Sequence, residues 1–110
     1  MDIAQIERFA MKGIAVNELP ERLDIIELMA FLCLRSLYRD FQNGRIERDQ
    51  ARREKGEILD TYARGEIQRR CYVEDNRRRN TISAVLTQMA KSDCPRCRYV
   101  ASVLDGRVKE

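Results

Sequence analysis

Four cysteines are the residues of this chain whose type and spacing point most directly to chemistry. Cys94 and Cys97 stand three positions apart in the run Asp-Cys-Pro-Arg-Cys, where a proline favours a tight turn and two thiolates can converge on one metal ion. Cys33 and Cys71 lie on segments with helical spacing of apolar residues, and both are expected to face inward. Together the four thiolates would close a tetrahedral, structural zinc site that joins three parts of the chain.

Two other interpretations of the cysteines stay open. Cys33 and Cys71 are also the kind of small buried thiol that protein cores commonly contain, with the other pair merely occupying a turn. A redox role would need the βαβ context of a thioredoxin-like motif, and the sequence shows no strand pattern. An enzymatic zinc site is disfavoured as well, because four thiolates leave no open position for water or substrate. Structural zinc is therefore the favoured cofactor.

The composition favours a folded protein that is not an enzyme. A length of 110 residues, with 35% charged and 44% hydrophobic residues, is typical of one globular helical domain, predicted to cover residues 1–110. Histidine is absent, which removes the side chain most often used as a general base near neutral pH. We therefore expect a binding protein rather than a catalyst.

The longest apolar run, residues 28–34, covers about two helical turns, whereas a helix that crosses a bilayer needs roughly 20 apolar residues. Nothing in the sequence resembles a signal peptide. We expect a cytoplasmic protein without a membrane partner. The reducing cytoplasm disfavours disulfides, which again favours metal-bound or free thiols.

Apolar residues recur at helical spacing along the chain, and no segment sustains the strict alternation of a strand, so the predicted fold class is all-α, a small helical bundle. The first helix is predicted at residues 2–12. Asp2 is its expected N-cap, and Gly13 is expected to end it in a left-handed turn.

The segment 20–42 is the most apolar of the chain and predicts a central helix that other helices cover on several sides. At 1.5 Å per residue it would be about 34 Å long and would traverse the whole domain. Pro20 fits its first turn, where the missing N–H has no intrahelical partner in any case. Asn43 and Gly44 are expected to end it, because both tolerate the left-handed conformation.

Two further helices are expected to end near glycines. Residues 46–63 predict a third helix with a solvated outer face, and Gly65 is expected to break or bend the chain after it. The cysteine turn is followed by a short helix at residues 98–104, which Gly106 is expected to stop.

Between them, the apolar positions of residues 66–91 fit one long helix, but the middle of this segment, residues 74–80, is wholly polar. We expect the helix to break or bend there. Asn76 or Asn80 would then cap the helix that restarts.

Basic residues concentrate in the second half of the chain. Residues 1–60 carry 10 basic and 12 acidic groups, while residues 61–110 carry 11 basic and 6 acidic ones, so the halves differ in net charge, −2 against +5. Such a cluster binds phosphate or acidic protein groups through bidentate guanidinium contacts, or it is only a solvated helix face. The candidate partner-binding residues in this region are Arg69, Arg70, Arg77, Arg78 and Arg79.

An acidic strip forms a second candidate contact surface. Glu54, Glu57 and Asp60 recur every three residues and would share one side of a helix. Such a strip commonly serves solubility alone. Its functional interpretation is a contact with the positively charged channel of a partner that handles nucleic acid.

The stretch from residue 31 to residue 55, with the runs Phe-Leu-Cys-Leu-Arg-Ser-Leu-Tyr (31–38) and Ala-Arg-Arg-Glu-Lys (51–55), resembles small Arg- and Glu-rich helical proteins of phages and mobile elements in Gram-positive bacteria. The cysteine set is similar to that of a zinc-containing member of the type II-A anti-CRISPR proteins. This resemblance implies a non-enzymatic inhibitor that binds a type II RNA-guided nuclease and keeps target DNA from loading. It carries over the four cysteines as metal ligands and no contact residue. The alternative is a DNA- or RNA-binding regulator that uses the arginine cluster at 69–79.

Overall fold

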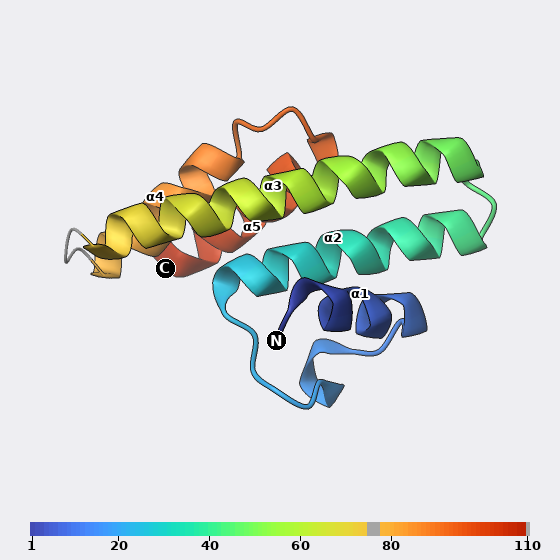
Figure 1. Ribbon diagram of the computed structural model, residues 1–110, viewed down its shortest axis with the longest axis horizontal. Coiled ribbons are helices and arrows are strands. Elements are labelled where there is room, and N and C mark those ends of the chain that lie inside the picture. Colours follow the sequence, from blue (N-terminus) through green and yellow to red (C-terminus); the bar gives the residue numbers. More distant parts are fainter. Residues whose placement is uncertain (75–77, 110) are drawn as a thin grey trace.

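The computed structural model describes the backbone of residues 1–74 and 78–109 and the side chains of residues 1–70 and 84–107. Five α-helices and one short 3₁₀ helix (Val16–Glu18) make up this part of the chain, and no strand occurs in it, so the all-α prediction is confirmed for the described residues. Figure 1 shows the arrangement, in which α2 (Ile25–Gln42) and α3 (Arg48–Glu74) run side by side as an antiparallel pair.

The first helix, α1 (Ile3–Lys12), forms where the sequence predicts it. Asp2 caps it, because its carboxylate accepts the backbone N–H of Gln5 at 2.9 Å while the side chain of Gln5 accepts the N–H of Asp2. Gly13 ends it at φ +71°, a left-handed conformation that a residue with a Cβ adopts only with strain. Both predicted ends are therefore confirmed.

The helix α2 is central, since it packs against α1, α3 and α5 (Pro95–Lys109). It begins later than predicted, and Pro20 lies in the loop before it. The reason is a capping box at the start of α2, where the carboxylate of Asp24 accepts the N–H of Glu27 at 2.8 Å and Glu27 returns the contact to the N–H of Asp24 at 3.1 Å. The helix ends as predicted, with Asn43 as its cap and Gly44 at φ +73°.

Gly65 does not break the third helix, contrary to one form of the prediction, because α3 is a single helix of 27 residues that runs through Gly65 to Glu74. Gly65 is buried, and a Cβ at this position would lie 2.8 Å from Sδ and 2.9 Å from Cε of Met89. The glycine therefore allows the end of α4 (Arg78–Met89) to approach the backbone of α3. At about 40 Å, α3 rather than α2 spans the longest dimension of the molecule, which is 44 Å.

The predicted break or bend in the polar segment is confirmed by the described residues on either side of it, since α3 and α4 are separate helices that pack against each other. Asn80 is not the cap of the second part, because it lies inside α4, whereas Asn76 falls outside the described residues. The last helix is longer than predicted and continues through Gly106.

All five helices contribute to one hydrophobic core, which has α2 at its centre. Its fully buried members come from α1 (Ile6, Ala10), α2 (Ile26, Met29, Ala30, Phe31, Cys33, Leu34, Leu37), α3 (Ile58), α4 (Val85, Leu86, Met89) and α5 (Cys97, Ala101, Leu104), with Cys94 at the start of α5. Within the described residues, no helix combines the length and the apolar character that crossing a membrane requires.

Candidate functional site

Three of the four cysteines lie together where the start of α5 meets the middle of α2. The Sγ of Cys33 lies 4.0 Å from the Sγ of Cys97, which follows it by 64 residues. Cys94 precedes Pro95, the first residue of α5, and its Sγ accepts the backbone N–H of Cys97 at 3.4 Å. All three side chains are buried. We refer to Cys33, Cys94 and Cys97 as the thiol cluster.

The thiol cluster is poorly suited to nucleophilic chemistry. Hydrogen bonding with Cys97 and burial raise the pKa of Cys94 far above the ordinary range of a thiol. Hydrogen bonding with Cys33, together with burial, raises the pKa of Cys97 to about 12, although contacts with Cys94 and Thr61 oppose this shift. Both thiols are therefore protonated at neutral pH in the metal-free chain, and a protonated, buried thiol reacts slowly.

Arg96, between the two cysteines of the turn, fixes the start of α5 to the rest of the bundle. Its Nη2 lies 3.0 Å from Oδ2 of Asp40 on α2 and 3.3 Å from Oε1 of Glu54 on α3, while its Nη1 donates to Oγ of Ser36. Burial lowers the pKa of Arg96, but the two carboxylates outweigh this effect and hold the guanidinium in its charged form. The position of the cysteine turn therefore depends on this arginine.

The predicted fourth ligand, Cys71, has a side chain that lies outside the described residues, so its part in a metal site stays a prediction. The backbone of α3 places position 71 ten residues beyond Thr61, or about 15 Å along the helix, whereas Thr61 itself contacts Cys97. Among the described side chains, no group of three or more His, Cys, Asp or Glu residues is arranged around a point that could hold a metal ion.

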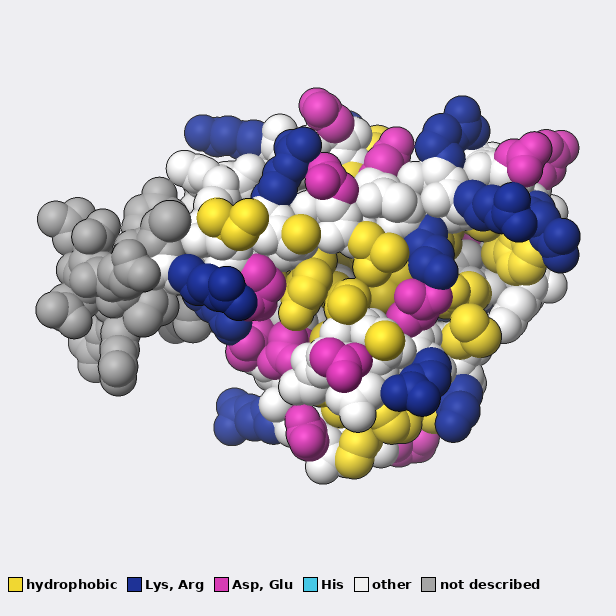
Figure 2. Space-filling model, in the orientation of Figure 1, with side chains coloured by type: hydrophobic (Ala, Val, Ile, Leu, Met, Phe, Trp, Pro, Cys, Tyr) yellow, Lys and Arg dark blue, Asp and Glu magenta, His cyan; other side chains and the backbone are white. Residues whose placement is uncertain are grey.

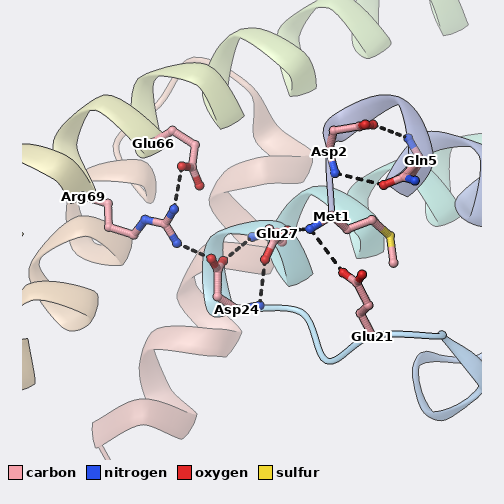
Figure 3. A network of polar contacts seen from close by, with 8 residues as sticks. All are labelled: Met1, Asp2, Gln5, Glu21, Asp24, Glu27, Glu66 and Arg69. Atoms are coloured by element: carbon pink, nitrogen blue, oxygen red, sulfur yellow. Dashed lines mark hydrogen bonds and ion pairs between the residues drawn. The ribbon is translucent and has the colours of Figure 1, made fainter.

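Arg69, a predicted partner-binding residue, lies in an internal network that links α3 to the start of α2. Figure 3 shows its guanidinium between the carboxylates of Asp24 and Glu66. Glu27, which belongs to the capping box with Asp24, also binds the amino group of Met1 at 3.1 Å. Arg69 therefore stabilises the junction of two helices, and its guanidinium is occupied by acceptors within the chain.

The remaining arginines of the predicted cluster divide into two groups. Arg70 has an exposed side chain on α3. Arg77 lies outside the described residues, and so do the side chains of Arg78 and Arg79, whose backbone forms the first residues of α4. The structure therefore describes the surroundings of only the first two arginines of the cluster, Arg69 and Arg70.

The predicted acidic strip is interrupted in the structure. Glu54 is turned into the bundle, where it pairs with Arg96. Asp60 is exposed and pairs with Arg64 one turn further along α3 at 3.1 Å. Glu57 is exposed. Two of the three carboxylates are therefore on the surface, and one serves the internal contacts of the cysteine turn.

The charged residues of the third helix do more than form the predicted solvated face. A groove of about 200 Å³ lies between the end of α2 and the start of α3, and Arg48, Arg52 and Lys55 line it. The available signal was their spacing of four and three residues, which places them on one side of a helix. That spacing alone does not show that apolar residues of α2 lie opposite.

Comparisons with known proteins add no relative to this picture. No protein-family model matches the chain, and no curated protein and no solved structure matches it either. The observations that bear on its function are therefore its own contacts, burial and charges, together with the resemblance carried by residues 31–55 and the cysteines.

Proposed function

We propose that this protein is a non-enzymatic binding protein whose helices are held together by a structural zinc ion at the thiol cluster. The observation that supports the proposal is the approach of Cys33 to Cys97 across 64 residues, at 4.0 Å between the sulfur atoms. Tetrahedral zinc with bonds of about 2.3 Å places two thiolates about 3.8 Å apart. The backbone N–H that Cys97 donates to Cys94 partly opposes the raised pKa of this thiol and would stabilise its thiolate in the presence of a metal.

Zinc binding would release the thiol protons and would contribute directly to the free energy of folding. The test is to measure the zinc content of the purified protein by mass spectrometry, together with its melting temperature before and after chelation. Cys33→Ser and Cys97→Ser should each lose the bound zinc and several kcal/mol of stability. Cys71→Ser tests the fourth ligand by the same measurement. Absence of zinc, with a melting temperature that chelation leaves unchanged, would overturn the metal proposal.

For the partner, we propose a type II RNA-guided nuclease that the protein inhibits by keeping target DNA from loading. The resemblance to anti-CRISPR proteins supports this proposal. The burial of the thiols fits its non-enzymatic part, because a buried thiol suits a structural rather than a reactive role. The expected result is that the protein co-elutes with the nuclease and its guide RNA and reduces cleavage of a target plasmid, without affinity for free DNA. Normal cleavage at a large molar excess would refute it.

A DNA- or RNA-binding regulator is the second candidate, and the exposed side chain of Arg70 within the arginine cluster favours it. Binding of this kind should weaken steeply as salt rises, because phosphate contacts release counterions. It should also disappear when residues 77–79 are changed to alanine. An electrophoretic mobility shift at two salt concentrations separates the two candidates.

A further inference from the structure

The groove between α2 and α3 has an apolar floor and one basic wall. Leu37 and Phe41 of α2 and Ala51 of α3 line its apolar part. Its volume of about 200 Å³ is smaller than the roughly 300–1,000 Å³ typical of small-molecule sites. The groove therefore has room for one bulky side chain of a partner rather than for a cofactor.

The basic wall belongs to α3, where Arg48, Arg52 and Lys55 follow one another at helical spacing. Lys55 forms an ion pair with Glu7 of α1, which raises the pKa of the lysine. Arg48 and Arg52 are exposed, and no carboxylate in the described part of the chain pairs with either. Two guanidinium groups at the groove are therefore available to an external anion.

Figure 2 shows the same end of the molecule, where the helices α2 and α3 are joined. Lys and Arg side chains lie there beside hydrophobic ones, and some Asp and Glu side chains lie at the same end. Phe41 contributes to this surface, with 36% of its side chain exposed. An apolar surface beside unpaired positive charge is complementary to an apolar side chain flanked by carboxylates.

We propose that this groove binds an acidic segment of a partner protein. One bulky apolar side chain of the segment enters the groove between Phe41 and Ala51, and neighbouring carboxylates pair with Arg48 and Arg52. The inference rests on the proposed function, in that it identifies the surface through which a binding protein of this kind contacts another protein.

The shape of the groove favours a protein segment over a nucleic acid. Bases are bound without sequence preference by stacking on exposed aromatic faces. Leu37 and Ala51 are aliphatic, and Tyr38 is half-buried with its hydroxyl donating to Glu7 at 2.9 Å, so Phe41 is the one exposed aromatic side chain among the residues that line the groove.

The test is fluorescence anisotropy with a labelled synthetic peptide, Asp-Glu-Glu-Phe-Glu-Asp-Glu, at low salt. We expect saturable binding that weakens at least tenfold in Arg48→Glu and in Arg52→Glu. Arg53→Glu is the matched control, because Arg53 is exposed on the same helix but does not line the groove. Arg22→Glu, an exposed residue that does not line the groove, measures the effect of net charge alone. The affinity of Arg53→Glu should differ from that of Arg22→Glu by less than twofold. Circular dichroism establishes that each variant is folded.

Two further probes separate the possible outcomes. A peptide with serine in place of phenylalanine should bind at least tenfold more weakly, and Ala51→Phe, which fills the groove, should weaken the original peptide to the same extent. Absence of saturable binding, or equal losses in Arg52→Glu and Arg53→Glu, overturns the inference. Tighter binding of a single-stranded oligothymidine, lost in Arg52→Glu, overturns it in favour of a nucleic acid. If the Arg48→Glu, Arg52→Glu double variant still inhibits the nuclease as the parent chain does, the groove is refuted as the contact surface while the proposed function stands.

Discussion

Replacing Gly65 by alanine should destabilise the protein, although Gly65 lies inside a helix. In isolation, alanine is favoured over glycine in a helix interior by about 1 kcal/mol. In this structure, however, the new Cβ would lie 2.8 Å from Sδ and 2.9 Å from Cε of Met89. Ordinary contacts between such atoms are about 3.5–4.0 Å, so the end of the Met89 side chain must move by about 1 Å.

The magnitude follows from the difference between these two effects. Met89 is only 3% exposed, so the flexible end of its side chain must shift within the core rather than out into solvent. Overpacking of a core by one methyl group costs about 1–3 kcal/mol. After the gain of about 1 kcal/mol in helix propensity, the net loss should be about 1 kcal/mol, with an upper bound of about 2 kcal/mol.

Gly56→Ala is the matched control, because Gly56 lies in the same helix and a Cβ there would meet nothing within 4 Å. It should gain about 0.5–1 kcal/mol. Urea unfolding followed by circular dichroism measures both changes, and the two variants should differ by about 2 kcal/mol. In a Met89→Ala background, where the clashing atoms are absent, Gly65→Ala should become stabilising.

Equal stabilisation by Gly65→Ala and Gly56→Ala would refute this reasoning, because it would mean that the end of α4 does not press on the backbone of α3. Destabilisation by Gly65→Ala that persists in the Met89→Ala background would refute it in another way. The cost would then come from a contact other than that with the methionine, such as the approach to Cγ2 of Ile26 at 3.5 Å.

Three further predictions follow from the charged contacts and the thiols. Arg96→Met should lower the free energy of unfolding in urea by about 1–3 kcal/mol, because it leaves the carboxylates of Asp40 and Glu54 without the cation that they share. A decrease below about 0.5 kcal/mol would contradict this prediction. Burial raises the pKa of Asp24, but the N–H of Glu27 and the guanidinium of Arg69 lower it below 3.8 overall. These contacts therefore stabilise the fold above about pH 4, and this stabilisation is lost as the pH falls through the lowered pKa. Arg69→Met should reduce this acid-side loss of at most about 1 kcal/mol, measured as the difference in unfolding free energy between pH 6 and pH 3, and an unchanged difference would speak against it. In the metal-free chain at pH 8, iodoacetamide should alkylate Cys97 at least about 100-fold more slowly when folded than in urea, and similar rates by mass spectrometry would show that the thiol is accessible.

The sequence predicts the fold class and those helix ends that local chemistry sets. Asp2 and Gly13 bound α1 as expected, and Asn43 with Gly44 ends α2, because a side-chain cap and a left-handed turn act within a few residues. The start of α2 was predictable by the same rules, since Asp24 and Glu27 have the spacing of a capping box. Proline is also common in a first turn, so Pro20 has a local signal for a helix start that competes with the capping box.

The errors concern glycines whose role depends on neighbours that are distant in the sequence. Gly65 has the same local signal as a helix end, but it is a contact point for Met89, 24 residues later, and that contact depends on how α4 folds back. The pairing of charges is equally non-local. Glu54 and Arg69 look like surface residues at helical spacing, yet Arg96 and Asp24 engage them from other helices. The approach of Cys33 to the cysteine turn was predictable, because cysteine is rare in this chain and both Cys33 and the turn contain it.

The 64 residues between Cys33 and Cys97 also separate these positions in time while the chain is being made. At about 5–20 residues per second, a ribosome needs about 3–13 s to proceed from one to the other. During this interval α1, α2 and α3 can associate, but the side of α2 that receives α5 has nothing to cover it. The nascent protein therefore presents an apolar strip for several seconds, and a chaperone that shields such strips has its opportunity before the last helix emerges.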